Sequence, residues 1–245
     1  TFEKSVREIF ASAMSEDALF YRSQRGLADK EEQMALLVQR VSGTHRQKYF
    51  FPDFAGVGLS YNIFLWQEKL DPRAGMLRLV LGLGTRAVDR VVDVYPRIVA
   101  LDQPLLKTYH DNEDAHKYSQ HNIDLLNKED NSLQAVALER LIEEKTEMHL
   151  EKLTQRDHHL MRRAQEYGLD QKEYWLTNFD NLFKETSFAK DMQKMLKALE
   201  KVYHCPVDIE FTANFTTDEQ LKINLLQCRP FQSTKSGQRI EFPEN

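Results

Sequence analysis

The feature that most constrains the fold is an alternation of apolar and polar side chains near the end of the chain. Over residues 207–211, Asp208 and Glu210 share one face of a strand while the apolar residues around them face a core. A second β-prone segment covers residues 221–228, and the polar residues 214–219 between them suit a turn. The pattern predicts an antiparallel hairpin that closes the chain.

The predicted hairpin carries polar groups that suit one site. Gln227 and Arg229 share a face of the second strand, as Asp208 and Glu210 share a face of the first. If the strands pair with all four groups on one side, carboxylates, an amide oxygen and a guanidinium converge. Hard oxygen ligands suit Mg²⁺ and a forked donor suits phosphate, so the set fits a magnesium-bound polyphosphate. The pattern also fits an exposed sheet face on which the acids only pair with Arg229.

Short apolar runs predict further strands. Residues 34–41 lack polar alternation, which favours a strand buried on both faces. The aromatic stretch 48–62 predicts a strand pair, and its glycines would let a backbone or a ligand come close. Turn residues 128–132 separate two β-capable segments, 122–126 and 133–136, and so predict a second hairpin.

Helical spacing dominates the start and the middle of the chain. Apolar residues recur every three to four positions over residues 2–14 and 187–203, and a further helix is expected at 18–25 after Ser15 as N-cap. Together with the strands, this predicts an α+β fold. We expect a mainly helical excursion over residues 138–203, followed by the closing hairpin at 204–232.

A glycine turn follows another predicted strand at residues 76–81. Gly82, Leu83 and Gly84 join this strand to a helix-compatible segment. A strand, a glycine turn and a helix start can offer free backbone amides to an anion. The same turn is common in proteins that bind no phosphate, so a purely structural turn is the alternative.

The composition excludes several classes of protein. With 33 basic and 38 acidic residues, the chain has a net charge of −5 and no basic field for nucleic acid. No run of eighteen apolar residues or secretory leader is visible, so we expect neither a membrane span nor a signal peptide. Two cysteines fit a reducing, cytoplasmic setting. Because the chain starts at Thr1 within an amphipathic segment, we expect a piece of a longer protein.

Four segments in a fixed order are specific enough to compare with a known family. The closing strands read Pro-Val-Asp-Ile-Glu-Phe at 206–211 and Leu-Leu-Gln-Cys-Arg-Pro at 225–230; residues 34–41, 55–62 and 81–84 supply the others. They resemble the nucleotide-binding domain of the pyruvate phosphate dikinase and phosphoenolpyruvate synthase family. Its motifs are Asp-Ile-Glu-Trp with Leu-Gln-x-Arg-Pro, Val-x-Val-Gln-x-Met, Ser-Gly-Val-x-Phe-Thr-x-Asn and Gly-Leu-Gly. Phe211 replaces the usual Trp, and Thr85 stands where many members carry an acid.

The resemblance implies an ATP-grasp fold, in which ATP lies between two lobes and its phosphates are held by magnesium and basic residues. Glu210 and Gln227 would then hold Mg²⁺ and the phosphates, and Arg229 would contact phosphate oxygens. Gln39 and the backbone of Val41 would form the edge that reads adenine. The matching motifs add further candidates for nucleotide binding, namely Asn62, Gly82, Gly84 and Asp208.

The implied function is the ATP-binding part of a dikinase-type phosphotransferase, which holds Mg-ATP for transfer to a histidine on another domain. Residues 1–245 would form the C-terminal part of an ATP-grasp domain, because the family's lysine-bearing N-terminal lobe and its phosphohistidine segment are not recognised in the chain. Those remaining domains of the parent chain would be its partners. One alternative is a catalytically inactive ATP-grasp-like sensing or interaction module of a larger signalling protein. The other is an ATP-grasp ligase, but the Leu-Gln-x-Arg-Pro ending resembles the dikinase branch instead.

Overall fold

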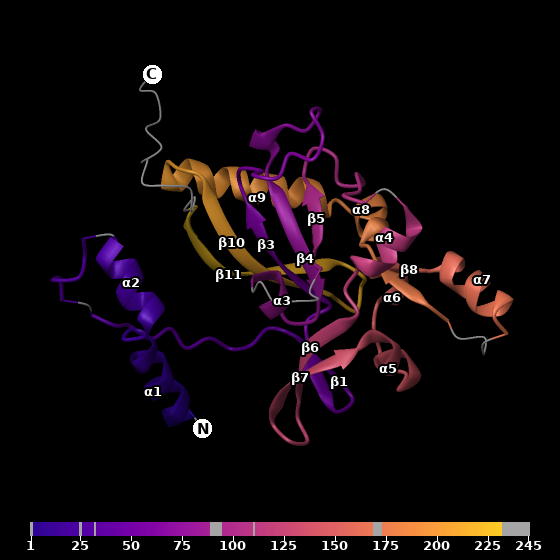
Figure 1. The fold of residues 1–245 in the computed structure, drawn as a ribbon, viewed down its shortest axis with the longest axis horizontal. Helices are drawn as coiled ribbons and strands as arrows, with labels where there is room; N and C mark the ends of the chain where they lie inside the picture. Colours follow the sequence, from indigo (N-terminus) through magenta and orange to yellow (C-terminus); the bar gives the residue numbers. More distant parts are fainter. Residues whose placement is uncertain are drawn as a thin grey trace. The chain divides into compact units, whose positions relative to one another are not determined.

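The computed structural model describes residues 2–24, 26–31, 33–88, 95–109, 111–168 and 173–231, which belong to two compact units, 1–41 and 42–245. The first unit contains α1 (Phe2–Ser12) and α2 (Glu16–Gln24), as Figure 1 shows. The Ala18 N–H donates to the Ser15 side chain, which caps α2. Both predicted helices are therefore confirmed, although neither has a buried residue.

The strand predicted at residues 34–41 is wrong. Residues 33–43 have no regular structure, and Leu37 and Val38 are 80% and 70% exposed. A strand is stable only with hydrogen-bonded neighbours and a surface against which its side chains pack. Among the described residues no strand pairs with this run, so its apolar character has no sheet to join.

The strands of the second unit form antiparallel sheets. The large sheet has the order β11-β10-β3-β4-β5, a second sheet has the order β1-β2-β6-β7, and β8 pairs with β9. Their pairings confirm the predicted strand at 76–81, the hairpin over 122–136 and the closing hairpin. The strands are β1 (Thr44–Arg46), β2 (Tyr49–Phe51), β3 (Phe54–Leu59), β4 (Met76–Leu81), β5 (Arg97–Ala100), β6 (Asn122–Asn127), β7 (Ser132–Ala137), β8 (Thr154–Arg156), β9 (Trp175–Thr177), β10 (Val207–Phe215) and β11 (Leu221–Pro230).

The strand pair predicted within residues 48–62 needs a correction. Both strands exist, but β2 pairs with β1 and β6, whereas β3 pairs with β10 and β4. Pro52 and Asp53 separate them. A two-residue hairpin turn needs positive φ at its first central residue, which proline cannot adopt, so the chain crosses from one sheet to the other instead.

Most helices of the second unit lie between β7 and β10 in the sequence. Residues 138–203 contain α5 to α9 together with β8 and β9. Within the described residues, no helix combines the length and apolar character needed to cross a membrane. The helical elements are η1 (Pro72–Ala74), α3 (Thr85–Val88), α4 (Asn112–Lys117), α5 (Leu138–Glu143), α6 (Leu150–Leu153), α7 (His158–Glu166), α8 (Asp180–Glu185) and α9 (Phe188–Tyr203).

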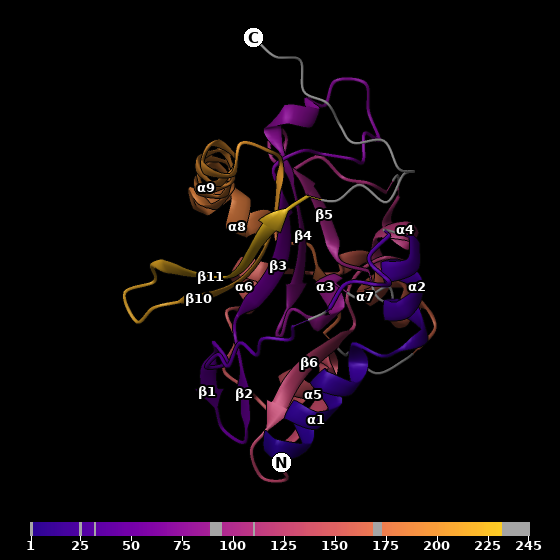
Figure 2. The same cartoon turned by 90° about the vertical axis from the view of Figure 1, so that its left-hand side faces the viewer.

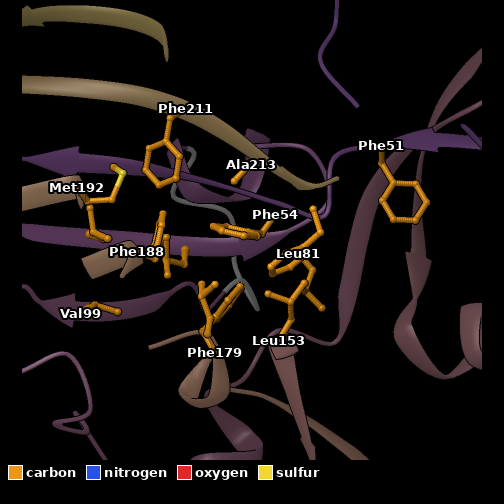
Figure 3. Close-up of a cluster of buried hydrophobic side chains, with 14 of the residues drawn as sticks. Phe51, Phe54, Leu81, Val99, Leu153, Phe179, Phe188, Met192, Phe211 and Ala213 are labelled. Atoms are coloured by element: carbon orange, nitrogen blue, oxygen red, sulfur yellow. The ribbon is translucent and has the colours of Figure 1, made fainter. Parts of the chain in front are cut away.

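The main hydrophobic core covers one face of the large sheet, and it is formed with residues of the second sheet and of α5, α6, α8 and α9. Figure 2 shows α9 beside this sheet. Phe188 and Met192 of α9 pack with Phe54 of β3 and Phe211 of β10 in the cluster drawn in Figure 3. The rings of Phe54 and Phe188 meet edge to face, with centroids 5.2 Å apart. Successive side chains of a strand point to opposite faces, so the alternate residues of β10 project from the other face of the sheet.

That opposite face carries a smaller apolar cluster. Ala55, Val57 and Leu59 of β3 pack there with Met76 and Val80 of β4, and the cluster also includes Ala87 of α3. The large sheet is therefore buried on both sides around β3 and β4. Its polar side chains are concentrated on the β10–β11 hairpin beside this cluster.

Candidate functional site

The register of the closing hairpin brings the predicted polar residues together. Asp208 lies opposite Arg229, and Glu210 lies opposite Gln227. All four belong to the face of β10 and β11 that points away from the core residues Ile209 and Phe211. The pairing shifts by one residue between Glu210 and Phe211, a β-bulge of the kind often found beside functional sites.

Asp208 and Arg229 form an ion pair at the outer end of this face. The Arg229 Nε and Nη2 groups both donate to Asp208 Oδ2, at 3.1 and 3.0 Å. The Arg229 side chain is 52% exposed and that of Asp208 is 13% exposed. This is the pairing that the sequence left open as an alternative. It uses only two of the five N–H donors of the guanidinium, so Arg229 can bind an anion without leaving Asp208.

Glu210 and Gln227 provide oxygen atoms on directly facing residues of neighbouring strands. Such cross-strand partners have Cα atoms about 4.5–5.5 Å apart, so both side chains can reach one small ion. Mg²⁺ is usually bound through one or two protein oxygens, with phosphates and waters completing its octahedron. Among the described residues no group of three or more His, Cys, Asp or Glu is placed to hold a metal. The donor set therefore fits Mg²⁺ that arrives with a polyphosphate better than a closed metal site.

Arg78 lies in the same cross-strand row as Glu210 and Gln227, and the sequence analysis did not single it out. A continuous cross-strand row runs Gln227, Glu210, Val57, Arg78 and Ile98 from β11 to β5. Arg78 is partly buried between Met76 and Val80 of the apolar cluster. It is the sole charged residue in β3 and β4, and this interruption of an apolar run was the available signal.

Two buried polar atoms near the site have no hydrogen-bond partner among the described residues. They are Nδ2 of Asn62, in a residue 1% exposed, and Oγ1 of Thr212, in a residue 4% exposed. Asn62 is a predicted nucleotide-binding residue, and its Oδ1 accepts from the Phe64 N–H at 2.9 Å. Thr212, which the sequence reading missed, follows Glu210 on the same face of β10. Buried groups without partners cost stability, and such atoms are compatible with a polar ligand.

The chain also matches a known protein family. A family model described as "Pyruvate phosphate dikinase, AMP/ATP-binding domain" matches residues 2–244. The chain belongs to this family. A search of curated proteins gave no match. The membership confirms the resemblance, and it supports an AMP/ATP-binding role in a dikinase-like protein with an enzyme-related function.

In this dikinase-family domain, the glycine turn has a structural reason at Gly82. Its φ is +75°, and an added Cβ would lie 2.6 Å from the carbonyl oxygen of Asp124 in β6. At Gly84 an added Cβ would meet only the Cβ of Ala55, at 3.4 Å. Gly82 is therefore required by backbone conformation and by close packing of the turn against β6. The nucleotide roles of Gly82 and Gly84 stay predictions.

Asp124 of β6 accepts hydrogen bonds from the glycine turn and from the start of α3. The Leu83 N–H donates to the Asp124 carbonyl at 2.9 Å. The carboxylate of Asp124 accepts from Thr85 Oγ1 at 2.6 Å and from Arg86 Nε at 2.7 Å. The Leu83 amide is therefore not free for an anion, because β6 supplies its acceptor. At this residue the purely structural turn, the alternative left open by the sequence, is the better description.

Gln39 and Val41 lie in the first unit of the domain, apart from the hairpin residues in the chain. Both are exposed, and Val41 is 47% exposed. They belong to unit 1–41, whereas Glu210, Gln227 and Arg229 belong to unit 42–245. Their role as the edge that reads adenine stays a prediction that no longer has a strand to support it.

Proposed function

We propose that this chain is the ATP-binding part of a dikinase-type phosphotransferase with an ATP-grasp fold. It holds Mg-ATP for phosphoryl transfer to a histidine on another domain of the parent chain. The observation that carries the proposal is the register of the closing hairpin, which sets Glu210 opposite Gln227 and Asp208 opposite Arg229. Membership of an AMP/ATP-binding domain family supports it.

Each polar residue of the hairpin has a role that follows from its chemistry. Glu210 and Gln227 would hold Mg²⁺ through their oxygens, and Asp208 orients Arg229 through the shared Oδ2 contact. Arg229 donates its remaining N–H groups to phosphate oxygens. Mg²⁺, when bound, neutralises charge on the phosphates. Phosphoryl transfer needs this positioning and charge stabilisation more than covalent help from the protein.

The remaining parts of the reaction belong to other domains in this proposal. A lysine-bearing N-terminal lobe closes over the nucleotide, and a phosphohistidine domain accepts the phosphate. We therefore expect the isolated chain to bind ATP weakly and to show no turnover. The final phosphoryl acceptor, such as pyruvate, water or a glucan, is chosen by those other domains.

A second candidate is a catalytically inactive sensing or interaction module. The observation in its favour is the Asp208–Arg229 ion pair, in which each residue has its charge partner within the hairpin. An ion-paired sheet face of this kind can persist in a scaffold that has lost its ligand. The two candidates differ in whether Mg²⁺ changes nucleotide binding through Glu210.

The first test measures Mg-ATP binding by NMR titration, which detects weak complexes. We compare the wild-type chain with Glu210→Gln and with a control, Glu219→Gln, which alters an exposed acid in the turn of the same hairpin. Wild type and control should bind ATP more tightly with Mg²⁺ than without it. Glu210→Gln should weaken Mg-ATP binding at least about tenfold and abolish the effect of Mg²⁺. Equal affinities in all three proteins, with and without Mg²⁺, would favour the inactive module.

The second test uses the full-length protein that contains this chain. Glu210→Ala should abolish ATP-dependent phosphorylation of the protein while its thermal unfolding stays unchanged. Phosphorylation at the wild-type rate in this variant would reject the assignment of Glu210 to the site.

A further inference from the structure

Four exposed lysines form a line along the outer face of α9. This lysine stripe consists of Lys190, Lys194, Lys197 and Lys201, at spacings of four, three and four residues. Residues that are three or four positions apart lie on the same face of an α-helix. With a rise of about 1.5 Å per residue, the stripe is roughly 16 Å long. The opposite face of α9 holds the buried residues Phe188, Met192 and Leu196, so the stripe points away from the sheet beside which Figure 2 shows the helix.

The lysine stripe is not neutralised within the described part of the chain. Lys194 Nζ lies 3.9 Å from Asp191 Oδ1, and the other three lysines have no ion-pair partner among the described residues. α9 contains four lysines and two acids, a charge of +2, whereas the whole chain has a charge of −5. On α1, by contrast, each basic residue pairs with an acid four residues away. The stripe is therefore a local exception to the charge of the chain.

The lysine stripe does not stabilise α9 itself. Like charges four residues apart on a helix repel each other, and the stripe contains two such pairs, Lys190 with Lys194 and Lys197 with Lys201. Lys190 also lies in the first turn, where the partial positive charge of the helix N-terminus makes a cation unfavourable. A line of cations that acts against its own helix indicates an anionic partner outside the chain.

Apolar side chains beside the lysine stripe indicate the kind of partner. Ala198 and Val202 follow Lys194 at four-residue intervals, and Val202 is 73% exposed. An apolar surface next to cations suits a protein segment that carries both carboxylates and apolar side chains. The stripe contains no arginine, whose planar fork matches phosphate, and the chain lacks the basic field that nucleic acid requires. A protein partner is therefore favoured over nucleic acid.

We propose that the outer face of α9 binds an acidic amphipathic helix of a partner protein. A helix that lies alongside α9 presents carboxylates at the same spacings of three and four residues, so it can match the stripe over about three turns. Its apolar residues pack on Ala198 and Val202. Lysine suits this role, because an ammonium group on a flexible stem adjusts to carboxylates in differing positions. This surface lies on the side of the sheet opposite Glu210, and it does not depend on the proposed function.

The test uses a synthetic helical peptide with glutamates at the spacing of the stripe and leucines beside them. Fluorescence anisotropy measures its binding to the chain. The double change Lys194→Gln and Lys197→Gln, the stripe variant, should weaken binding at least about tenfold. Val202→Ser should weaken it about threefold, because an apolar contact is lost. The control, Lys69→Gln with Lys128→Gln, removes the same charge at exposed positions outside α9 and should bind like wild type.

A second peptide separates helix recognition from general attraction between opposite charges. It has the same composition, but its glutamates are distributed around all faces of the helix. It should bind wild type at least about fivefold more weakly than the first peptide. Equal binding of the two peptides would overturn the inference, and so would equal losses in the stripe variant and in the control.

Further measurements identify the occupant and check the fold. If duplex RNA or anionic vesicles bind through the stripe more tightly than the peptide does, the proposed helix is not the occupant. Self-association of the chain that disappears in the stripe variant would identify a second copy instead and would also overturn the inference. The stripe variant should unfold at a temperature no lower than wild type, because the substitutions remove repulsion between lysines. A lower unfolding temperature would contradict the claim that the stripe acts against its helix.

Discussion

An Arg–Asp pair lies at each end of the paired strands β3 and β10, and the two pairs differ in burial and in their hydrogen-bond partners. Asp53 precedes β3, and it is held by Arg46, by His149 Nδ1 at 2.9 Å and by the Phe215 N–H at 2.8 Å. The side chains of Asp53 and Arg46 are only 2% and 4% exposed. At the other end, Asp208 has Arg229 alone as its ion-pair partner within the described residues, and Arg229 is half exposed.

The difference separates a structural pair from a pair available to a ligand. The carboxylate of Asp53 accepts hydrogen bonds at both oxygens from within the protein, and the side chains of Asp53 and Arg46 are almost fully buried. Arg229 instead keeps donors that point away from Asp208. An Arg–Asp pair that is enclosed by the protein thus stabilises the fold, whereas a pair with an exposed arginine can also bind a ligand.

The largest expected effect is the loss of the closed pair. Asp53→Asn keeps the size of the side chain but leaves the buried Arg46 without its anion, so we expect the free energy of unfolding to fall by about 3 kcal/mol. The matched change Asp208→Asn should lower it by less than about 1 kcal/mol, because that pair is exposed. Urea unfolding of both variants measures the contrast. Losses of similar size would remove the distinction between the two ends of the ladder.

The glycine turn extends the same comparison to backbone positions. Gly82→Ala forces a side chain into the left-handed region and against the Asp124 carbonyl, so we expect a loss of about 2 kcal/mol. Gly84→Ala meets ordinary van der Waals contact, and a change of about 0.5 kcal/mol or less is expected. Thermal unfolding of the two variants gives the values. A Gly84 variant that is as unstable as the Gly82 variant would contradict this account of the turn.

The smallest expected effect is a dependence on pH at the closed pair. Burial alone raises the pKa of Asp53, but the hydrogen bond from His149, the charge of Arg46 and the Phe215 N–H together hold this pKa below its ordinary value of 3.8. A lowered pKa in the folded state stabilises the protein above the unfolded pKa, and this contribution is lost as pH falls through the folded pKa. The stability difference between wild type and Asp53→Asn should therefore be constant above about pH 5 and shrink below about pH 4. Denaturant titrations at several pH values check this. A stability difference that grows at low pH would contradict a lowered pKa of Asp53.

Local patterns predicted much of the fold and part of the site. The alternation around Asp208 and Glu210 was enough to predict the strand and its polar face, because side-chain direction in a strand has a period of two. The turn predicted at 214–219 begins later, since β10 continues to Phe215. The same reasoning was wrong for residues 34–41, since an apolar run does not reveal whether a partner strand is present. The Arg46–Asp53–His149 cluster was also missed, because its members lie up to about a hundred positions apart.

The sequence by itself determined the family, the helix at residues 188–203, the closing hairpin and the four polar groups on one of its faces. Each of these follows from short-range periodicity or from a continuous motif. The tertiary structure alone decided that β3 lies between β10 and β4, and hence that Arg78 joins the row of Glu210 and Gln227. It also decided that Asp53 is enclosed while Arg229 stays open. Strand order and burial depend on contacts between distant segments, and no local pattern contains that information.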